Sequence, residues 1–461
     1  MSGWVVLKFG GSSVARPEHW RNIATIITRR RQAGWRVMVV LSALKNVTNM
    51  LEGLLHQARA GVHAQALANL HRLHLQFATD LGLDGETILG ATWQALNECL
   101  DRIAQHKTIT PRLHASVLAY GELMSTQLGV AYLHQQGLPV IWQDARHWLV
   151  SEPKGDAWHD YLSAECDYRP DPVWRASLPE QAIVITQGFI ASHPNGDTVL
   201  LGREGSDTTA AYLAAKLGAE ALEIWTDVPG IFTTDPREDS TARQLKYLSY
   251  AQAVDMTACG ARVLHHRALA PAQKNNIPVW IRATSDPDQA GTKLCADVAH
   301  HDSAIAVARQ DDVLWLQFEP LPQSEMDRVI HVLSSHGFDL LGQFAAIDRV
   351  DLVLYWANTD APEPDVTSLI PISPQKVECG LARVTVIGGQ QGDWQSSLGD
   401  VLSTRVPVRV QFNEPTKISW LVPVGAGIEA QRALHEQVCQ RLPASLVGLA
   451  WQGWVNSSQA R

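Results

Sequence analysis

The chain has 461 residues, of which 46% are hydrophobic and 18% are charged. These proportions are typical of a packed globular protein and exclude a disordered chain. At about 150 residues per domain, the length predicts about three domains. The 38 basic and 47 acidic residues give a net charge of −9, which argues against a protein that binds the nucleic-acid backbone.

The apolar runs, the N-terminal segment and the cysteines indicate the cellular compartment. No uncharged apolar run approaches the about 18 residues that a membrane-spanning helix needs. No basic leader precedes the first apolar segment. The six cysteines contain no C-x-x-C pair, so we expect reduced thiols rather than a disulfide framework or a zinc site. We therefore expect a cytoplasmic protein without a membrane or nucleic-acid partner.

Short β-branched runs alternate with helical patterns in the first part of the chain. The runs are nearly continuous in apolar residues, which is typical of strands buried on both faces. They are Val5–Phe9, Val37–Leu41, Val140–Trp142, Ile183–Thr186, Leu222–Trp225 and Val279–Ile281. Apolar residues at helical spacing predict a helix over Pro17–Ala33, residues 52–135 are also expected to be helical, and Pro153–Pro179 is expected to be loop. Strand, glycine loop, helix and strand form a βαβ unit, so we predict an α/β fold with a mostly parallel sheet.

The pattern changes near Asp286-Pro287-Asp288, which indicates a connector. Beyond it, shorter segments twice follow the order strand, helix, strand, strand. The first copy is predicted over Val313–Phe318, Ser324–Ser335, Phe338–Phe344 and Val350–Trp356, and the second over Val384–Ile387, Ser396–Ser403, Val406–Phe412 and Ile418–Val422, with a last helix over Ile428–Arg441. We therefore predict two small α+β modules of roughly 80 residues each.

The first motif, Lys8-Phe9-Gly10-Gly11-Ser12-Ser13, ends the first predicted strand. Adjacent glycines let the backbone turn tightly and present N–H groups to an anion. Lys8 would place an ammonium group where a transferring phosphoryl group gathers negative charge. A plain turn with a surface lysine is the alternative. Neither a P-loop motif nor a G-x-G-x-x-G after a strand is present.

The second motif runs from Gly202 to Thr209 and opens an alanine-rich segment that favours a helix. Glycine, serine, aspartate and threonine at a helix start form a second anion site, and Arg203 can hold a carboxylate with two hydrogen bonds. An ordinary helix cap at Ser206 or Asp207 is the alternative.

The third motif, Trp225–Arg237, is a turn-rich loop that follows a predicted strand. Open α/β sheets bind ligands at loops of this kind, next to the carboxyl ends of their strands.

Together these stretches resemble the aspartate kinase family, most closely its lysine-sensitive, single-function bacterial type. Blocks in the family's order over the first 295 residues carry the resemblance. They are Lys8–Val14, Ser42-Ala43, Val47–Asn49, Gly121–Thr126, Gln187–Ile190, Leu201–Arg203, Gly205–Asp207, Trp225–Arg237, Gly260–His265 and Ile277–Val279. The resemblance implies an amino-acid kinase domain at residues 1–295, a three-layer α/β sandwich, followed by ACT-like regulatory modules at residues 300–380 and 381–461.

The resemblance also implies an activity, the transfer of the ATP γ-phosphate to the side-chain carboxylate of L-aspartate. The product would be 4-phospho-L-aspartate, which enters lysine, threonine and methionine biosynthesis. Lys8 would stabilise the phosphate in flight, and Asp207 would orient that lysine. Arg203 would bind the α-carboxylate of aspartate, with Glu122 near its ammonium group. Further hydrogen bonds to substrate or phosphates would come from Ser42, Thr48 and Ser206.

For the nucleotide, the resemblance implies MgATP, with Mg²⁺ held mainly by the nucleotide itself. The nucleotide-binding residues would be Lys8, Gly10, Gly11, Ser12, Thr226, Asp227, Phe232, Arg237 and Arg262. Phe232 stands where the family often has tyrosine, and Arg262 where it usually has a lysine. Glu204 stands where the family usually has glycine, and its carboxylate would repel ATP if it pointed inward.

The resemblance implies that the ACT-like modules bind a feedback amino acid, lysine or threonine, at a dimer interface. We therefore expect a homodimer or a larger assembly. However, Glu319–Gln323 lies where a more glycine-rich effector loop is expected, so modules that only dimerise the chain stay an alternative. Two other functions also stay open: a kinase of glutamate, N-acetylglutamate or UMP, and a non-catalytic protein that binds amino acids.

Overall fold

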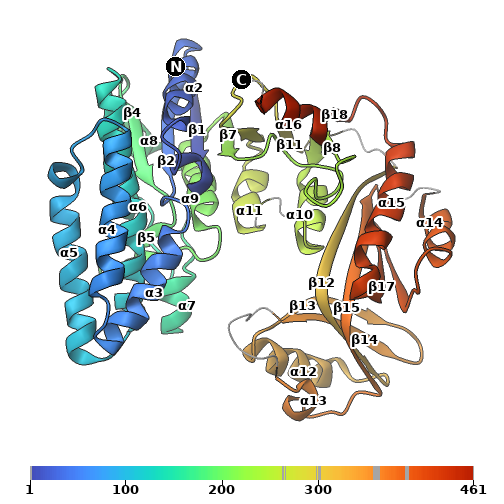
Figure 1. The fold of residues 1–461 in the computed structure, drawn as a ribbon. Coiled ribbons are helices and arrows are strands. Elements are labelled where there is room, and N and C mark those ends of the chain that lie inside the picture. The colour runs from blue at the N-terminus through green and yellow to red at the C-terminus, as the bar shows by residue number, and fades with distance from the viewer. Residues whose placement is uncertain are drawn as a thin grey trace.

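The computed structural model describes residues 3–261, 264, 266–296, 298, 303–356, 364–389 and 394–459. Two large sheets organise these residues, one of eight strands and one of six (Figure 1). No helix in these ranges is long and apolar enough to cross a membrane.

The eight-stranded sheet is mostly parallel, as the sequence predicts. Its strands, in order across the sheet, are β3 (Val140–Trp142), β4 (Ile183–Gln187), β2 (Arg36–Leu41), β1 (Trp4–Phe9), β7 (Ala221–Thr226), β10 (Val279–Ala283), β11 (Thr292–Cys295) and β9 (Tyr247–Ser249). Every neighbouring pair from β3 to β10 is parallel, β11 is antiparallel to β10, and β9 is parallel to β11.

Helices cover both faces of this sheet, so the domain has three layers. Val5, Leu7 and Phe9 of β1 pack with one set of helices, and the alternate residues Trp4 and Val6 pack with the other. The first set is α2 (His19–Gln32), α3 (Val47–Ala60), α4 (Ala64–Asp80), α5 (Gly85–His106) and α6 (Pro111–Gln135). The second set is α9 (Gly205–Leu217), α10 (Tyr250–Ala258) and α11 (His266–Lys274). The predicted three-layer sandwich is confirmed.

Short elements complete this part of the chain. They are α1 (Gly11–Val14), α7 (Ala157–Leu162), α8 (Pro172–Ser177), β5 (Ile190–Ser192), β6 (Thr198–Leu200), β8 (Arg243–Leu245) and a 3-10 turn at Ala145–His147. The segment expected to be loop, Pro153–Pro179, therefore contains two helices. Asp156 and Asp171 cap them by accepting hydrogen bonds from the backbone N–H groups of their first turns.

The six-stranded sheet is antiparallel and contains both predicted modules. Its order is β13 (Phe338–Ala345), β14 (Val350–Trp356), β12 (Ala304–Phe318), β15 (Lys376–Gly388), β17 (Lys417–Pro423) and β16 (Val410–Glu414). Its helices are α12 (Gln323–Ser335), α13 (Val366–Leu369), α14 (Trp394–Ser403) and α15 (Gly427–Arg441), with a 3-10 turn at Val424–Ala426. Each half repeats strand, helix, strand, strand. The long central strands β12 and β15 pair with each other, which joins the halves into one sheet.

After α15 the chain returns to the first domain. Strand β18 (Val447–Ala450) pairs antiparallel with β8, and α16 (Trp451–Gln459) follows it. Figure 1 shows α16 close to β8 and β11, far from α12 and α13. The sequence did not predict this returning segment.

Candidate functional site

Lys8 and Asp207 form a buried ion pair between β1 and α9. Side chains alternate along a strand, so Lys8 lies on the same face of β1 as Trp4 and Val6, which is the face that α9 covers. Asp207 lies in the first turn of α9. The Lys8 Nζ and Asp207 Oδ1 atoms are 2.5 Å apart, and the two residues are only 8% and 7% exposed. The pair therefore fixes an ammonium group at the end of the strand.

The glycine turn after β1 lies tightly against two neighbouring strands. The Gly10 N–H donates to the carbonyl of Trp225 at the end of β7, at 3.0 Å. A Cβ atom at Gly11 would lie 2.9 Å from the carbonyl oxygen of Ala43, which follows β2. Only glycine allows this close approach of two loops.

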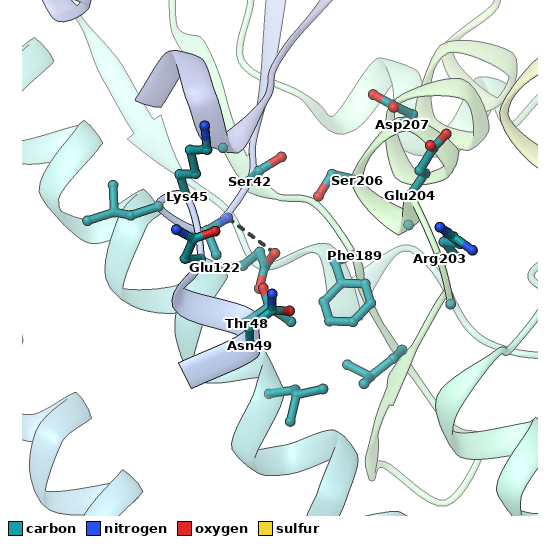
Figure 2. Close-up of a pocket in the computed structure, with 18 of the residues that line it drawn as sticks. Ser42, Lys45, Thr48, Asn49, Glu122, Phe189, Arg203, Glu204, Ser206 and Asp207 are labelled. Carbon is teal, nitrogen blue, oxygen red and sulfur yellow. Dashed lines mark hydrogen bonds between the residues drawn. The ribbon is translucent and has the colours of Figure 1, made fainter. Parts of the chain in front are cut away.

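A cavity of about 590 Å³ lies between these loops, α3, α6 and α9 (Figure 2). Eight of the predicted site residues line it: Lys8, Gly11, Ser42, Thr48, Glu122, Arg203, Ser206 and Asp207. Gly10 and Ser12 belong to the glycine turn but do not line the cavity. The fold thus gathers residues that are almost 200 positions apart in the sequence into one polar site.

Glu122 is the most perturbed titratable group in the cavity. It is 3% exposed, and its Oε1 accepts a hydrogen bond from the Ala43 N–H at 3.2 Å, the dashed line in Figure 2. Its Oε2 is buried without a hydrogen-bond partner among the residues that the structure describes. Burial raises the pKa of Glu122 to about 8, against the opposing effects of the Ala43 N–H and Lys8. A cation that entered the cavity could pair with Oε2 of Glu122, and this pairing would favour the ionised carboxylate.

The start of α9 forms the opposite wall. Ser206 lies so close to Gly188 that a Cβ atom at Gly188 would be 2.5 Å from its Oγ. Arg203 and Glu204 are exposed and line the cavity beside Ser206 (Figure 2). Glu204 has φ 53°, in the left-handed region, which explains why glycine suits this position.

Four more predicted residues, Thr226, Asp227, Phe232 and Arg237, lie at the end of β7 or on the loop after it. Thr226 ends β7 beside the end of β1, and its Oγ1 donates to Asp227 Oδ1 at 3.0 Å. Farther along, the exposed Arg237 donates from Nε and Nη2 to the carboxylate of Asp235, at 2.9 and 2.6 Å. None of these residues lines the cavity. Thr226 and Asp227 nevertheless lie at the carboxyl end of β7, next to the glycine turn at the carboxyl end of β1.

Phe232 is buried, at 6% exposure, inside a contact with the end of the chain. Its ring packs edge-to-face on Trp451 of α16, with the centroids 5.4 Å apart. Arg262, the last of the predicted nucleotide residues, lies outside the described residues.

The cavity also contains side chains that were not predicted as site residues, among them Lys45, Asn49, His114 and Phe189. Two of them, Asn49 and Phe189, belong to the blocks that carry the resemblance. Lys45 is exposed and has no ion pair with any residue that the structure describes. His114 precedes Glu122 by eight residues on α6, so helical spacing alone places both on one face.

The described residues contain no cluster of three or more histidine, cysteine, aspartate or glutamate side chains that could hold a metal ion.

Comparison with known proteins identifies the family. The amino acid kinase family pattern matches residues 3–283. The lysine-sensitive aspartokinase 3 of Escherichia coli K12 is 32% identical over 404 residues, which are 84% of this chain and 88% of the relative. A chloroplastic bifunctional aspartokinase/homoserine dehydrogenase of Zea mays is 35% identical over 310 residues, but the match spans only 33% of that longer protein.

Solved structures agree. The E. coli aspartokinase III structure in complex with aspartate and ADP, an R-state, superposes with a TM-score of 0.77 and 28% identity, over 95% of this chain and 100% of that one. The T-state of the same enzyme, in complex with lysine and aspartate, gives a TM-score of 0.74 over 94% of this chain. The chain therefore belongs to the amino acid kinase family and, within it, to the aspartokinases.

Proposed function

We propose that this chain is an aspartate kinase that transfers the γ-phosphate of ATP to the side-chain carboxylate of L-aspartate. The product would be 4-phospho-L-aspartate, at the first step of lysine, threonine and methionine biosynthesis. The observation that carries the proposal is the buried Lys8–Asp207 ion pair at one wall of a cavity whose other walls present Glu122 and Arg203. The relatives that are named aspartokinases support the same assignment.

The reaction needs positioning and charge neutralisation rather than a base. The nucleophile is a carboxylate, which is already ionised at neutral pH. Lys8 would stabilise the charge that builds up on the migrating phosphoryl group, since an ammonium group fixed in a buried site acts strongly on developing charge. Asp207 would hold the lysine in place through the 2.5 Å contact.

The cavity chemistry matches an amino-acid acceptor. The buried, unpartnered Oε2 of Glu122 suits an ammonium group, and Arg203 suits an α-carboxylate. These two residues would hold the two ends common to every amino acid. Hydrogen bonds from Ser42, Thr48 and Ser206 would then direct the side-chain carboxylate of the acceptor toward Lys8.

On the nucleotide side, we propose that the turn at Gly10, Gly11 and Ser12 approaches the phosphates. Thr226 and Asp227 would bind the base and ribose, and Arg237 would reach the polyphosphate after leaving Asp235. Phe232 is buried against Trp451, so we assign it a role in fixing the conformation of the loop after β7 rather than in contacting the nucleotide.

We propose that Mg²⁺ binds at this site together with ATP. Because the described residues present no ligand cluster, and because Asp207 is already paired with Lys8, the ATP phosphates would hold the ion. Bound there, Mg²⁺ would neutralise phosphate charge.

We further propose a cytoplasmic, homodimeric or larger enzyme that is feedback-regulated by lysine or threonine through its six-stranded sheet. The T-state aspartokinase III structure in complex with lysine supports regulation by lysine. The working division is residues 1–295 for catalysis and residues 300–380 and 381–461 for regulation.

A hydroxamate assay for acyl phosphate tests the function. We expect hydroxamate with aspartate and MgATP, and inhibition by lysine or threonine but not by methionine. A stronger response to glutamate, N-acetylglutamate or UMP in a coupled ADP-release assay would overturn the acceptor. Absence of MgATP binding at millimolar concentrations would instead favour a non-catalytic amino-acid-binding protein. Glu204 at the cavity rim is the reason to test this alternative, because its carboxylate would repel ATP if it pointed inward.

A further inference from the structure

The loop between β7 and β8, residues 227–242, is held by two elements from the far end of the chain. One is α15, on the regulatory sheet, and the other is the returning segment of β18 and α16. This β7–β8 loop carries Asp227 and Arg237, which the proposed function assigns to the nucleotide, and Phe232, which it assigns to the shape of the loop. The contacts that hold it therefore bear on nucleotide binding.

His435 of α15 makes the most buried of these contacts. It is 1% exposed, its Nδ1 lies 2.8 Å from Asp239 Oδ2, and its Nε2 lies 2.8 Å from Thr233 Oγ1. Burial lowers the pKa of His435, although Asp239 opposes this, and a lowered pKa favours the neutral ring. The neutral ring then donates from Nδ1 to the carboxylate and accepts the Thr233 hydroxyl at Nε2.

The partners of His435 are themselves fixed within the loop. The Thr233 Oγ1 atom accepts the Arg243 N–H at 3.0 Å, and the Asp239 Oδ1 atom accepts from the Thr241 N–H and hydroxyl at 2.9 and 2.6 Å. One imidazole thus links Thr233, in the middle of the loop, to Asp239 near its end. The loop also has long-range contacts to β11 and β12, through Thr292, Val307 and Arg309.

Neighbouring residues of α15 extend this contact along one helix face. Gln431 Nε2 donates to Thr234 Oγ1 at 2.8 Å, and Arg432 donates to the carbonyl of Glu238 at 2.9 Å. Leu434, by contrast, is buried in the core of the regulatory sheet. The helix therefore has one face in the regulatory core and another on the β7–β8 loop.

The returning segment holds the same loop from its other end. The Trp451 N–H donates to the carbonyl of Ala242 at 2.9 Å, and the Trp451 ring packs edge-to-face on Phe232. Trp454 lies against Trp451, with the ring centroids 5.0 Å apart, and is itself buried. The rings of Trp451 and Trp454 thus form a buried aromatic cluster with Phe232.

We propose that His435 and Trp451 are positioning residues for the nucleotide, which act on MgATP binding through the β7–β8 loop. The inference rests on the proposed function for the placement of the nucleotide. It distinguishes the two substrates, because the proposed aspartate-binding residues all line the cavity between Lys8 and Asp207 and none of them belongs to this loop. Loss of either positioning residue should weaken MgATP binding and spare aspartate.

The test measures KM for each substrate, with the other saturating, in His435→Ala and Trp451→Ala. We expect KM for MgATP to rise about fivefold or more, as for one lost buried hydrogen bond, and KM for aspartate to stay within about twofold. His435→Gln, which keeps an acceptor near the Nε2 position, should recover part of the MgATP affinity, as should Trp451→Phe. Leu434→Ala is the matched control, since it loosens α15 from its other face.

The outcomes are distinct. Equal changes in both KM values, unchanged KM for MgATP in both variants, or the same rise in Leu434→Ala would overturn the inference. If the alanine variants do not fold, the Gln and Phe variants carry the test. Calorimetric titration with MgADP provides a readout without turnover: a wild type that binds MgADP but does not phosphorylate aspartate refutes the proposed function, while weaker MgADP binding by the variants still supports the inference.

Discussion

The buried carboxyl group of Glu122 should make aspartate binding depend on pH. Its pKa of about 8 means that only about one molecule in ten carries the ionised form at pH 7. An ammonium group pairs with the ionised form, and desolvation is the cause of the raised pKa. KM for aspartate should therefore fall about tenfold per unit as the pH rises toward 8, and level off above it.

Initial rates of ADP release at saturating MgATP, from pH 6 to 9, measure this dependence. Glu122→Gln keeps the shape and the acceptor for the Ala43 N–H but cannot ionise, so its KM for aspartate should be high and nearly independent of pH. Aspartate binding at pH 7 should also release close to one proton, which calorimetry in buffers of different ionisation enthalpy detects. A flat wild-type profile below pH 8, or the same slope in Glu122→Gln, would refute the reasoning.

Three other substitutions test the site. Lys8→Ala should lower kcat by about two to three orders of magnitude while circular dichroism shows a folded protein, and near-normal turnover would remove Lys8 from the mechanism. Glu204→Gly should raise the free energy of unfolding by about 1 kcal/mol, because glycine adopts φ 53° without strain, and should lower KM for MgATP; Glu204→Gln, which removes only the charge, should reproduce the second effect alone. Lys45→Ala should raise KM for MgATP a few fold, with Lys107→Ala, an exposed lysine outside the cavity, as the control.

The parallel sheet could be predicted because its strands are buried on both faces. A strand of that kind is a short apolar run whatever its register, so Val5–Phe9 and Val37–Leu41 stand out from the helical stretches between them. A lysine near the end of such a run, with two glycines after it, is a weak signal alone and became specific only together with the other blocks. Motif reasoning of this kind pointed to Lys8, Arg203, Ser206 and Asp207, which lie near a strand end and a helix start, whereas Ser42, Thr48 and Glu122 were implied only by the family resemblance.

Other features left weaker signals. Strand β12 begins at Ala304, but charged residues over Arg309–Asp312 interrupt its apolar run, and Asp312 has φ 56° where the register shifts. The sequence therefore indicated only the second half of this strand. The start of helix α8 has a local signal in Asp171-Pro172, a capping residue followed by proline, but the surrounding Asp- and Pro-rich composition favours a loop.

The environment of Phe232 could not be predicted at all. Its neighbour Trp451 lies more than 200 residues away in the sequence, on a helix that follows a four-residue strand. A strand so short has no periodicity of its own, and it forms because β8 offers backbone partners in a two-stranded sheet. Contacts of this kind depend on tertiary structure alone.

The shared six-stranded sheet limits how this protein can be divided or recombined. The two halves meet along β12 and β15, and the boundary between residues 380 and 381 falls inside β15. A chimera that exchanged one half with a relative would have to rebuild that strand pair across two unrelated sequences. Residues 304–441 are thus the smallest unit to transplant, and the host must also supply a β7–β8 loop that accepts α15.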